Sequence, residues 1–287
     1  MKKVLAPYAA FSSPELLSGW SDWGLGDAGI EVPISWMDSV NLNRAKIRGP
    51  IAITGLPSLM DRIQTQAGYG LASADEVGRR QAVADFKKAY ELCRHVDFFE
   101  FHSGPRSPDV QAFRRSLLDL APVVSDSGPA LLLEHCDRFA PGFAKGFLDL
   151  DSEIQAIQET GFPARILINW GRSALEARSA DEPRRHLVRL REHGLLGGIV
   201  FSGVCSASEV YGNWADSHAP FGPGFQGIAQ DSASLMSKDR VRECVEQLRL
   251  AGVSWFGAKI QVLPKTLSLE QRVDWLKDVH RFLGELG

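Results

Sequence analysis

The sequence predicts a single (β/α)8 barrel over residues 1–287, with a long lid-like loop after the seventh strand. Short β-branched or aromatic runs alternate with amphipathic stretches that carry helix caps, which is typical of βαβ units around a parallel sheet. Eight such runs in under 300 residues match the TIM barrel. The rival is a doubly wound open sheet. Its nucleotide-binding forms lack support because no GxGxxG follows the first run and no Walker A sequence occurs.

The predicted strands are short apolar runs bounded by polar or turn residues. They cover residues 3–9, 30–35, 51–56, 96–102, 130–136, 164–170, 197–203 and 254–261.

The predicted helices begin and end at recognisable signals. A capping box at Ser73–Glu76 opens a helix that places Val77, Val83, Phe86 and Tyr90 on one apolar face. The other signals are an N-cap at Ser107 before Pro108, a cap at Asp181 with Gly194 after the helix, an N-cap at Ser237 and a capping box at 268–271.

Two connections are longer than a bare barrel needs. Residues 36–49 follow the second strand, and residues 204–236 follow the seventh. The longer one contains the aromatic residues Tyr211, Trp214, Phe221 and Phe225. A connection of this length is typical of a lid or a binding loop, and it belongs on the C-terminal face, where TIM barrels carry their active sites.

Strand alternation predicts which side chains face the barrel axis. In the fourth run, Phe99 and Phe101 face the helices, so Glu100 and His102 face inward. The same alternation turns inward Glu31, Glu134, Asn169, Ser202, Lys259 and Gln261. Because unpaired ionised groups are costly to bury, this set predicts a polar pocket. The alternative is an internal ion-pair network, such as Glu100 or Glu134 with Lys259, that only fills the barrel.

Further candidates lie at or just beyond the strand ends. Arg172 suits either a bidentate grip on an anionic substrate group or a salt bridge at a helix start. Asp216 and His218 lie together in the long loop. The tryptophans that suit stacking on a sugar ring, or rim packing, are Trp36, Trp170 and Trp214.

Composition excludes several function classes. Acidic residues outnumber basic ones by 35 to 32, so we expect neither nucleic-acid nor membrane binding. The four cysteines form no CxxC, which indicates a reducing compartment. The basic start has too short an apolar run for a signal peptide, and no apolar stretch reaches about 18 residues. We therefore expect a cytoplasmic protein, and homo-oligomerisation stays open.

Two short motifs carry a family resemblance. Gly29-Ile30-Glu31-Val32 and Leu133-Glu134 resemble strand motifs of the xylose-isomerase-like barrels, the superfamily of sugar isomerases, ketose 3-epimerases and endonuclease IV. The opening Ala6-Pro7-Tyr8-Ala9-Ala10 and residues 168–173 look like an uncharacterised bacterial family within it. The resemblance covers the whole chain as an order of eight strands and implies sugar chemistry.

The resemblance also implies a metal site, from which this sequence departs. The epimerases hold a divalent ion with glutamate, aspartate, histidine and a second carboxylate from strands five to eight. Glu134 matches, but Asn169, Ser202 and the Lys259/Gln261 pair replace the others. These are poor ligands for Mn²⁺ or Mg²⁺, so we predict no metal and no other cofactor. The competing view rebuilds a site from Glu134 with His102, His135, Asp137 or His218.

The sequence predicts acid–base chemistry on a small-molecule sugar or glycoside. The expected catalytic residues are Glu134, Glu100, His102 and Lys259. The expected substrate-binding residues are Glu31, Tyr8, Trp36, Asn169, Trp170, Arg172, Asp216, His218 and Gln261. Alternatives are a glycoside hydrolase using Glu100 and Glu134, a Schiff-base enzyme using Lys259, and a non-catalytic sugar-binding barrel.

Overall fold

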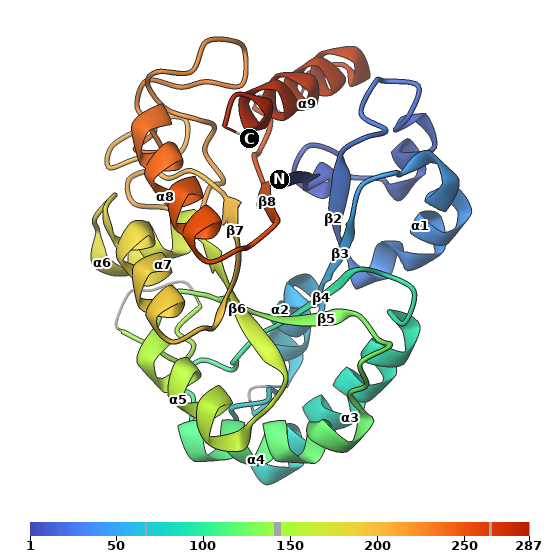
Figure 1. The fold of residues 1–287 in the computed structure, drawn as a ribbon, viewed down its shortest axis with the longest axis vertical. Coiled ribbons are helices and arrows are strands. Elements are labelled where there is room, and N and C mark those ends of the chain that lie inside the picture. The colour runs from blue at the N-terminus through green and yellow to red at the C-terminus, as the bar shows by residue number, and fades with distance from the viewer. Residues whose placement is uncertain (67, 141–144, 264–265, 287) are drawn as a thin grey trace.

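Eight parallel strands close into a barrel in chain order, with β8 paired back to β1 (Figure 1). This confirms the predicted (β/α)8 fold. The structure is a computed structural model that describes residues 1–66, 68–140, 145–263 and 266–286. The strands are β1 (Lys2–Leu5), β2 (Gly29–Pro33), β3 (Ile51–Thr54), β4 (Phe98–Phe101), β5 (Ala130–His135), β6 (Ala164–Asn169), β7 (Leu196–Phe201) and β8 (Trp255–Ala258).

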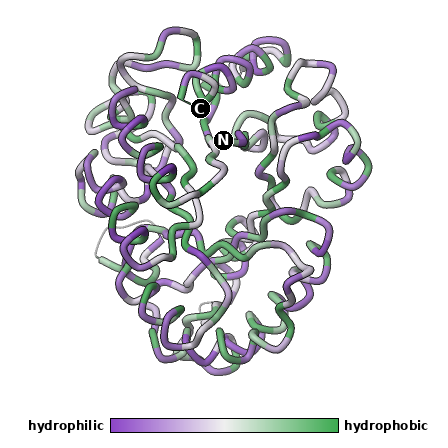
Figure 2. The backbone as a smooth tube through the Cα atoms, in the orientation of Figure 1, coloured by the Kyte–Doolittle hydropathy of each residue, from purple (hydrophilic) through white to green (hydrophobic). Residues whose placement is uncertain are grey.

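Helices form an outer ring around the strands (Figure 1), and along the chain they alternate between hydrophilic and hydrophobic segments (Figure 2). The α-helices are α1 (Met37–Asn43), α2 (Leu56–Thr65), α3 (Glu76–Leu92), α4 (Val110–Leu120), α5 (Leu150–Thr160), α6 (Trp170–Ala177), α7 (Glu182–Glu192), α8 (Lys238–Leu250) and α9 (Leu269–Gly284). The 3₁₀ turns are η1 (Pro7–Ala9), η2 (Pro14–Gly19), η3 (Ile34–Trp36), η4 (Arg44–Lys46) and η5 (Ala121–Val123).

The main core lies between the strands and these helices. Phe99 and Phe101 of β4 pack on Phe86 of α3, with ring centroids 5.3 and 5.4 Å apart. Glu100, between them in sequence, is fully buried on the opposite face. The alternation predicted for this strand is therefore the one observed, and it turns polar side chains toward the barrel axis.

The strands are shorter than the predicted runs at their C-terminal ends. Pro7 has no N–H for the sheet and opens η1, so β1 ends at Leu5. In β8 the regular pairing ends at Ala258. Tyr8 and Lys259 therefore lie just beyond the strand ends.

The predicted capping box at Ser73 is wrong. The N-cap of α3 is Asp75, whose carboxylate accepts a hydrogen bond from the Val77 N–H at 3.0 Å. Glu76 cannot complete a box because its carboxylate binds Arg79 instead. Val77, expected on the apolar face, belongs to the first turn and is 74% exposed.

Two other local predictions also need correction. Asp109, not Ser107, caps α4 and accepts from two backbone N–H groups. The loop expected over 36–49 is largely helical, because η3, α1 and η4 occupy most of it. The capping box at Ser268 is confirmed, as is the left-handed Gly194 after α7, with φ of 69°.

The long loop over 204–236 has two parts. A pair of backbone hydrogen bonds of 2.9 Å joins Gly203 to Ala219 and closes the first part. In the second part, Phe221 and Phe225 pack on Phe282 of α9, with ring centroids 5.5 and 4.9 Å apart. The second part is thus core, not lid, because its aromatic rings fill space beneath α9.

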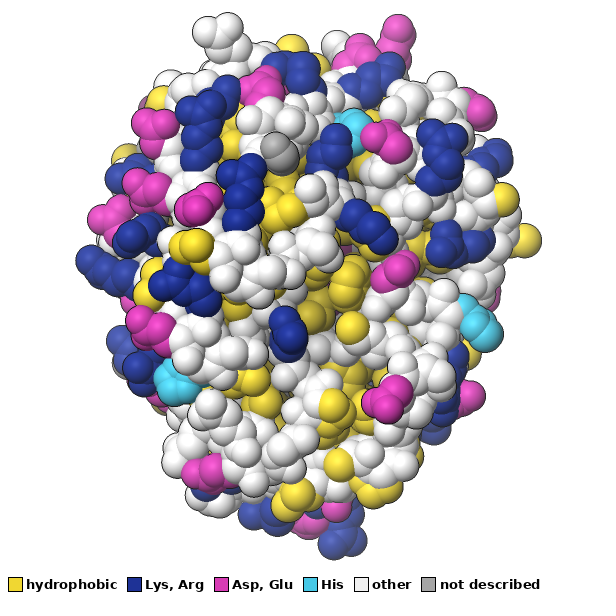
Figure 3. Space-filling model, in the orientation of Figure 1, with side chains coloured by type: hydrophobic (Ala, Val, Ile, Leu, Met, Phe, Trp, Pro, Cys, Tyr) yellow, Lys and Arg dark blue, Asp and Glu magenta, His cyan; other side chains and the backbone are white. Residues whose placement is uncertain are grey.

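The surface and the cysteines are ordinary for a barrel of this kind. On the face drawn in Figure 3, positive and negative side chains are interspersed, with hydrophobic side chains between them. Across the described ranges, none of the helices combines the length and the apolar character needed to span a bilayer. All four cysteines are buried and free.

Candidate active site

Tyr8, Glu31 and Lys259 meet at the C-terminal ends of β1, β2 and β8. The Tyr8 hydroxyl donates to Glu31 Oε1 at 2.8 Å, and Lys259 Nζ lies 3.4 Å from the same oxygen. Burial alone would lower the pKa of Lys259, but Tyr8, Glu31 and Glu134 raise it well above its usual value. Lys259 is therefore a fixed ammonium, which argues against the Schiff-base alternative.

Glu134 lies between two donors on neighbouring strands. His102 Nε2 is 2.7 Å from Glu134 Oε2, and Asn169 Nδ2 donates to Oε1 at 3.0 Å. Burial raises the pKa of Glu134, but the His102 hydrogen bond and the charge of Lys259 outweigh it, so the pKa lies well below its usual value. Burial also lowers the pKa of His102. Glu134 is thus an ionised acceptor, and neutral His102 donates to it.

Asn169 is held in place by its position in the chain. It is the last residue of β6 and also the N-cap of α6, and its Oδ1 accepts from the backbone N–H of Arg172. This cap orients the amide so that Nδ2 points to Glu134.

Glu100 is the third carboxyl group of the cluster. Both of its oxygens are buried and without a hydrogen-bond partner among the described residues. Burial, followed by the negative charges of Glu31 and Glu134, raises its pKa well above the usual value. Its surroundings therefore favour the neutral, protonated form of Glu100, next to the ionised Glu134.

Arg172 lies under the loop and joins two carboxylates. Its guanidinium donates to Asp137 at 2.9 Å and also binds Asp216. Burial raises the pKa of Asp216, but Arg172 outweighs it and holds that pKa low. Of the two roles predicted for Arg172, the structure shows the salt bridge: this residue ties the loop to β5.

His218 and Gln261 border the open side of the cluster. His218 Nδ1 lies 2.6 Å from the Ser202 hydroxyl, and its carbonyl accepts from the Gln261 N–H. Burial lowers the pKa of His218 to about 4. A cavity of about 440 Å³ opens beside Tyr8, His218 and Gln261, large enough for a small ligand.

The two tryptophans predicted to bind substrate lie in different places. Trp36 makes an edge contact with Tyr8, at 6.5 Å between ring centroids, so it borders the cluster. Trp170 is fully buried, and its indole lies beside Cys244 of α8. Trp170 follows Asn169 in sequence and therefore faces the helix layer, so it does not reach the site.

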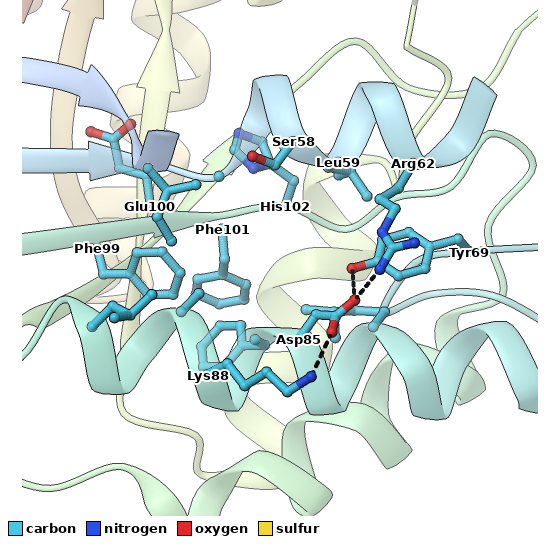
Figure 4. A pocket seen from close by; sticks show the side chains of 17 residues that line it. Ser58, Leu59, Arg62, Tyr69, Asp85, Lys88, Phe99, Glu100, Phe101 and His102 are labelled. Atoms are coloured by element: carbon cyan, nitrogen blue, oxygen red, sulfur yellow. Dashed lines mark hydrogen bonds and ion pairs between the residues drawn. The ribbon is translucent and has the colours of Figure 1, made fainter. Parts of the chain in front are cut away.

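A second cavity, of about 340 Å³, lies outside the barrel between α2, α3 and β4. Figure 4 shows Phe99 and Phe101 pointing toward α3, with Glu100 and His102 on the other side of the strand. Among its charged residues, Asp85 is paired: it accepts from Arg62 and from the Tyr69 hydroxyl, both at 3.2 Å. Glu100 and His102 also line this cavity, so it lies against the helix layer and against two residues of the polar cluster.

The barrel centre does not fit the divalent ion of the sugar epimerases. Both oxygens of Glu134 are engaged by His102 and Asn169, and Lys259 adds a positive charge. His102, Glu134 and Cys136 do place three ligand-type atoms within 4.8 Å of one another. The 2.7 Å between His102 and Glu134 is, however, a hydrogen-bond distance. Two ligands of a tetrahedral zinc ion would lie about 3.3 Å apart, as bonds of ~2.0–2.1 Å require, so this trio does not have the spacing of a zinc site.

The structure brings together most of the residues predicted from the sequence. Trp170 is buried away from the cluster. Arg172 of α6 and Asp216 of the long loop form an ion pair beside it. Sequence reasoning missed Lys145, whose pKa is lowered by burial and by Arg172. It also missed a second polar cluster, around His135, behind β5. Its members come from different helices, and no short spacing in the sequence links them.

The chain matches one family model and one curated relative. The family described as "Domain of unknown function (DUF4862)" matches residues 25–275. The uncharacterized protein STM3670 of Salmonella typhimurium strain LT2 is 31% identical over 243 residues, which cover 79% of this chain and 75% of the relative.

Solved structures with the same fold include sugar epimerases and isomerase-like proteins. A D-psicose 3-epimerase, solved in the presence of D-fructose, superposes with a TM-score of 0.63 at 12% identity and covers 100% of both chains. A xylose isomerase domain protein from Alicyclobacillus acidocaldarius gives 0.63 at 15% identity, covering 100% of this chain and 98% of the other. A D-allulose 3-epimerase from Methylomonas sp., in complex with D-allulose, gives 0.64 at 11%, covering 100% and 97%. The predicted resemblance to xylose-isomerase-like barrels is confirmed.

Proposed function

Because the chain belongs to the DUF4862 family, whose description names no activity, we propose a function from the chemistry of its barrel centre. We propose a sugar isomerase- or epimerase-like enzyme that moves protons with its own side chains, without a divalent ion at that centre. The sugar-acting epimerases among the structures of the same fold support the substrate class.

The observation that carries the proposal is that the pKa values of two neighbouring carboxyl groups are shifted in opposite directions. Glu100 is a neutral acid and Glu134 an ionised acceptor, within one buried cluster. Pairs of titratable groups whose environments push their pKa values apart are the usual acid and base of a proton-transfer site. In this proposal Glu134 accepts a proton from the sugar carbon next to the carbonyl, and Glu100 supplies one; solvent then takes the proton from Glu134 and returns one to Glu100 before the next turnover.

Lys259 and Tyr8 would stabilise the negative charge that develops on the sugar oxygen. Lys259 is a buried ammonium, and the Tyr8 hydroxyl lies on the same Glu31 oxygen. Fixed donors of this kind, in a site that excludes water, stabilise a developing oxyanion more than water does. His218, Gln261 and Trp36 would hold the sugar at the cavity mouth.

The test is proton exchange with solvent. Purified protein is incubated with a panel of ketoses and aldoses, including D-fructose and D-psicose, in D₂O, and NMR follows deuterium uptake next to the carbonyl. We expect uptake with at least one sugar, unchanged by a chelator and lost in Glu134→Gln. Glu246→Gln, at an exposed position on α8, is the matched control. Activity that requires added Mn²⁺ and is lost on chelation would contradict the proposal.

Glycoside cleavage is the second candidate, because a neutral and an ionised carboxyl group are also what a glycosidase uses. Aryl glycosides distinguish the two. Release of the aryl group without any deuterium uptake from free sugars would favour cleavage. Saturable sugar binding with neither reaction would indicate a non-catalytic sugar-binding barrel.

A further inference from the structure

A second polar cluster lies outside the barrel axis, between β5 and helices α5, α6 and α7. His135 is completely buried, and its Nδ1 lies 2.7 Å from Glu153 Oε2. On its other side, Nε2 lies 3.3 Å from Glu176 Oε2. The ring of His186 stands 5.1 Å from that of His135, at 80°. None of these groups has a part in the proposed proton transfer.

The two ring nitrogens of His135 differ in their hydrogen bonding. The Nδ1 contact is a normal hydrogen bond, whereas Nε2 has no hydrogen-bond partner among the described residues. Ligand atoms of His135, Glu176 and His186 all lie within 4.8 Å of one another. The 3.3 Å between His135 and Glu176 equals the separation of two ligands around a tetrahedral zinc ion, about 3.3 Å for bonds of ~2.0–2.1 Å.

We propose that His135, Glu176 and His186 form a zinc site that stabilises the packing of α6 and α7 on β5. Two nitrogens and one carboxylate are a ligand set that zinc prefers. Glu153 holds the Nδ1–H of His135, as the carboxylate partner of a zinc-bound histidine does. The fourth position goes to water, because the side chains of Glu176 and His186 each keep 10% of their surface exposed.

The charges balance when zinc replaces a proton. Glu153 and Glu176 face His135 from its two sides, so two carboxylates lie beside this imidazole. Zinc binding releases the Nε2 proton to solvent, and the two carboxylates then neutralise the ion. Arg138, whose Nε lies 3.5 Å from Glu176, is half exposed and opposes the cation from the solvent side.

The experiment measures zinc binding to the whole chain. Protein is stripped with a chelator, dialysed and titrated with Zn²⁺, and bound zinc is counted by elemental analysis. We expect one ion per chain, a higher Tm, and with Co²⁺ the visible absorption of a tetrahedral site. Glu153→Gln should weaken binding by about 10–100-fold, since it removes only the partner of the ligand.

Matched variants locate the ion. His186→Gln and Glu176→Gln should abolish stoichiometric binding, whereas His193→Gln, at a partly exposed histidine that caps the end of α7, should keep it. Retention of zinc in His186→Gln with its loss in Glu134→Gln would place the ion at the barrel centre and overturn the proposal. Failure of wild-type protein to bind Zn²⁺ or to show the Co²⁺ spectrum would also overturn it, and that result does not depend on any variant folding.

Discussion

Glu100→Gln tests the claim that Glu100 is a neutral acid, independently of any substrate. The side chain is fully buried, makes no hydrogen bond with the described residues and lies near the charges of Glu31 and Glu134. Its pKa is therefore higher in the folded state than in the unfolded chain. Glutamine keeps the shape of the neutral acid and cannot ionise.

The expected effect follows from proton linkage. Below the unfolded pKa of about 4.3, Glu100 is protonated in both states and contributes no pH dependence. Above it, the unfolded chain releases the proton and the folded protein keeps it, so wild-type stability falls until the pH reaches the folded pKa. The loss is about 1.4 kcal/mol for each pH unit between the unfolded and the folded pKa.

Urea unfolding of wild type and Glu100→Gln at pH 5, 6 and 7 measures this effect. The free energy of unfolding of the variant, minus that of wild type, should grow by about 1.4 kcal/mol for each pH unit until the pH reaches the folded pKa of Glu100. Glu246→Gln, with an exposed side chain, should run parallel to wild type. Parallel curves for Glu100→Gln would show that Glu100 is ionised in the folded protein, and the assignment of the proton donor would fail.

Three further predictions concern the cation, the loop and the metal. Lys259→Met should abolish turnover, as measured by steady-state kinetics. In urea unfolding it should lower the free energy of unfolding by about 3–5 kcal/mol, because it leaves Glu31 buried without its cation. Phe221→Ala should cost about 3–5 kcal/mol in urea unfolding because its ring fills the core, and Trp214→Ala, which is only partly buried, should cost clearly less. A chelator should lower the Tm and leave turnover unchanged; loss of turnover that zinc restores would tie the metal to catalysis.

The barrel could be predicted from local patterns because each unit carries its own signals. Alternation in 96–102 gave both the outward phenylalanines and the inward Glu100, and it needed no long-range information. The first residue of a helix was harder to predict where two residues that can cap the helix lie close together in sequence. Ser73 and Asp75 are both good caps; in the structure Asp75 caps the helix, and the Glu76 carboxylate binds Arg79 and Arg80.

The site could be predicted only where one strand determines the direction of a side chain. Glu31, Glu134 and Asn169 fall within strands, so alternation is enough. Arg172 follows β6 closely in sequence, but its role depends on its contacts with Asp137 and with Asp216, a loop residue 44 positions away. The His135 cluster joins β5, α5, α6 and α7, so only the folded chain shows that its members meet.

The ammonium group of Lys259 influences the ionisation of three buried glutamates in different ways. Lys259 contacts Glu31 directly and helps to keep Glu134 ionised. The negative charges of Glu31 and Glu134 then act on Glu100, which has no cation of its own and keeps its proton. A carboxylate at position 259 would add repulsion to all three and would need a metal ion to offset it. Lys259 thus supplies the positive charge of the barrel centre, and its distance from each carboxyl group decides which of them favours the ionised form.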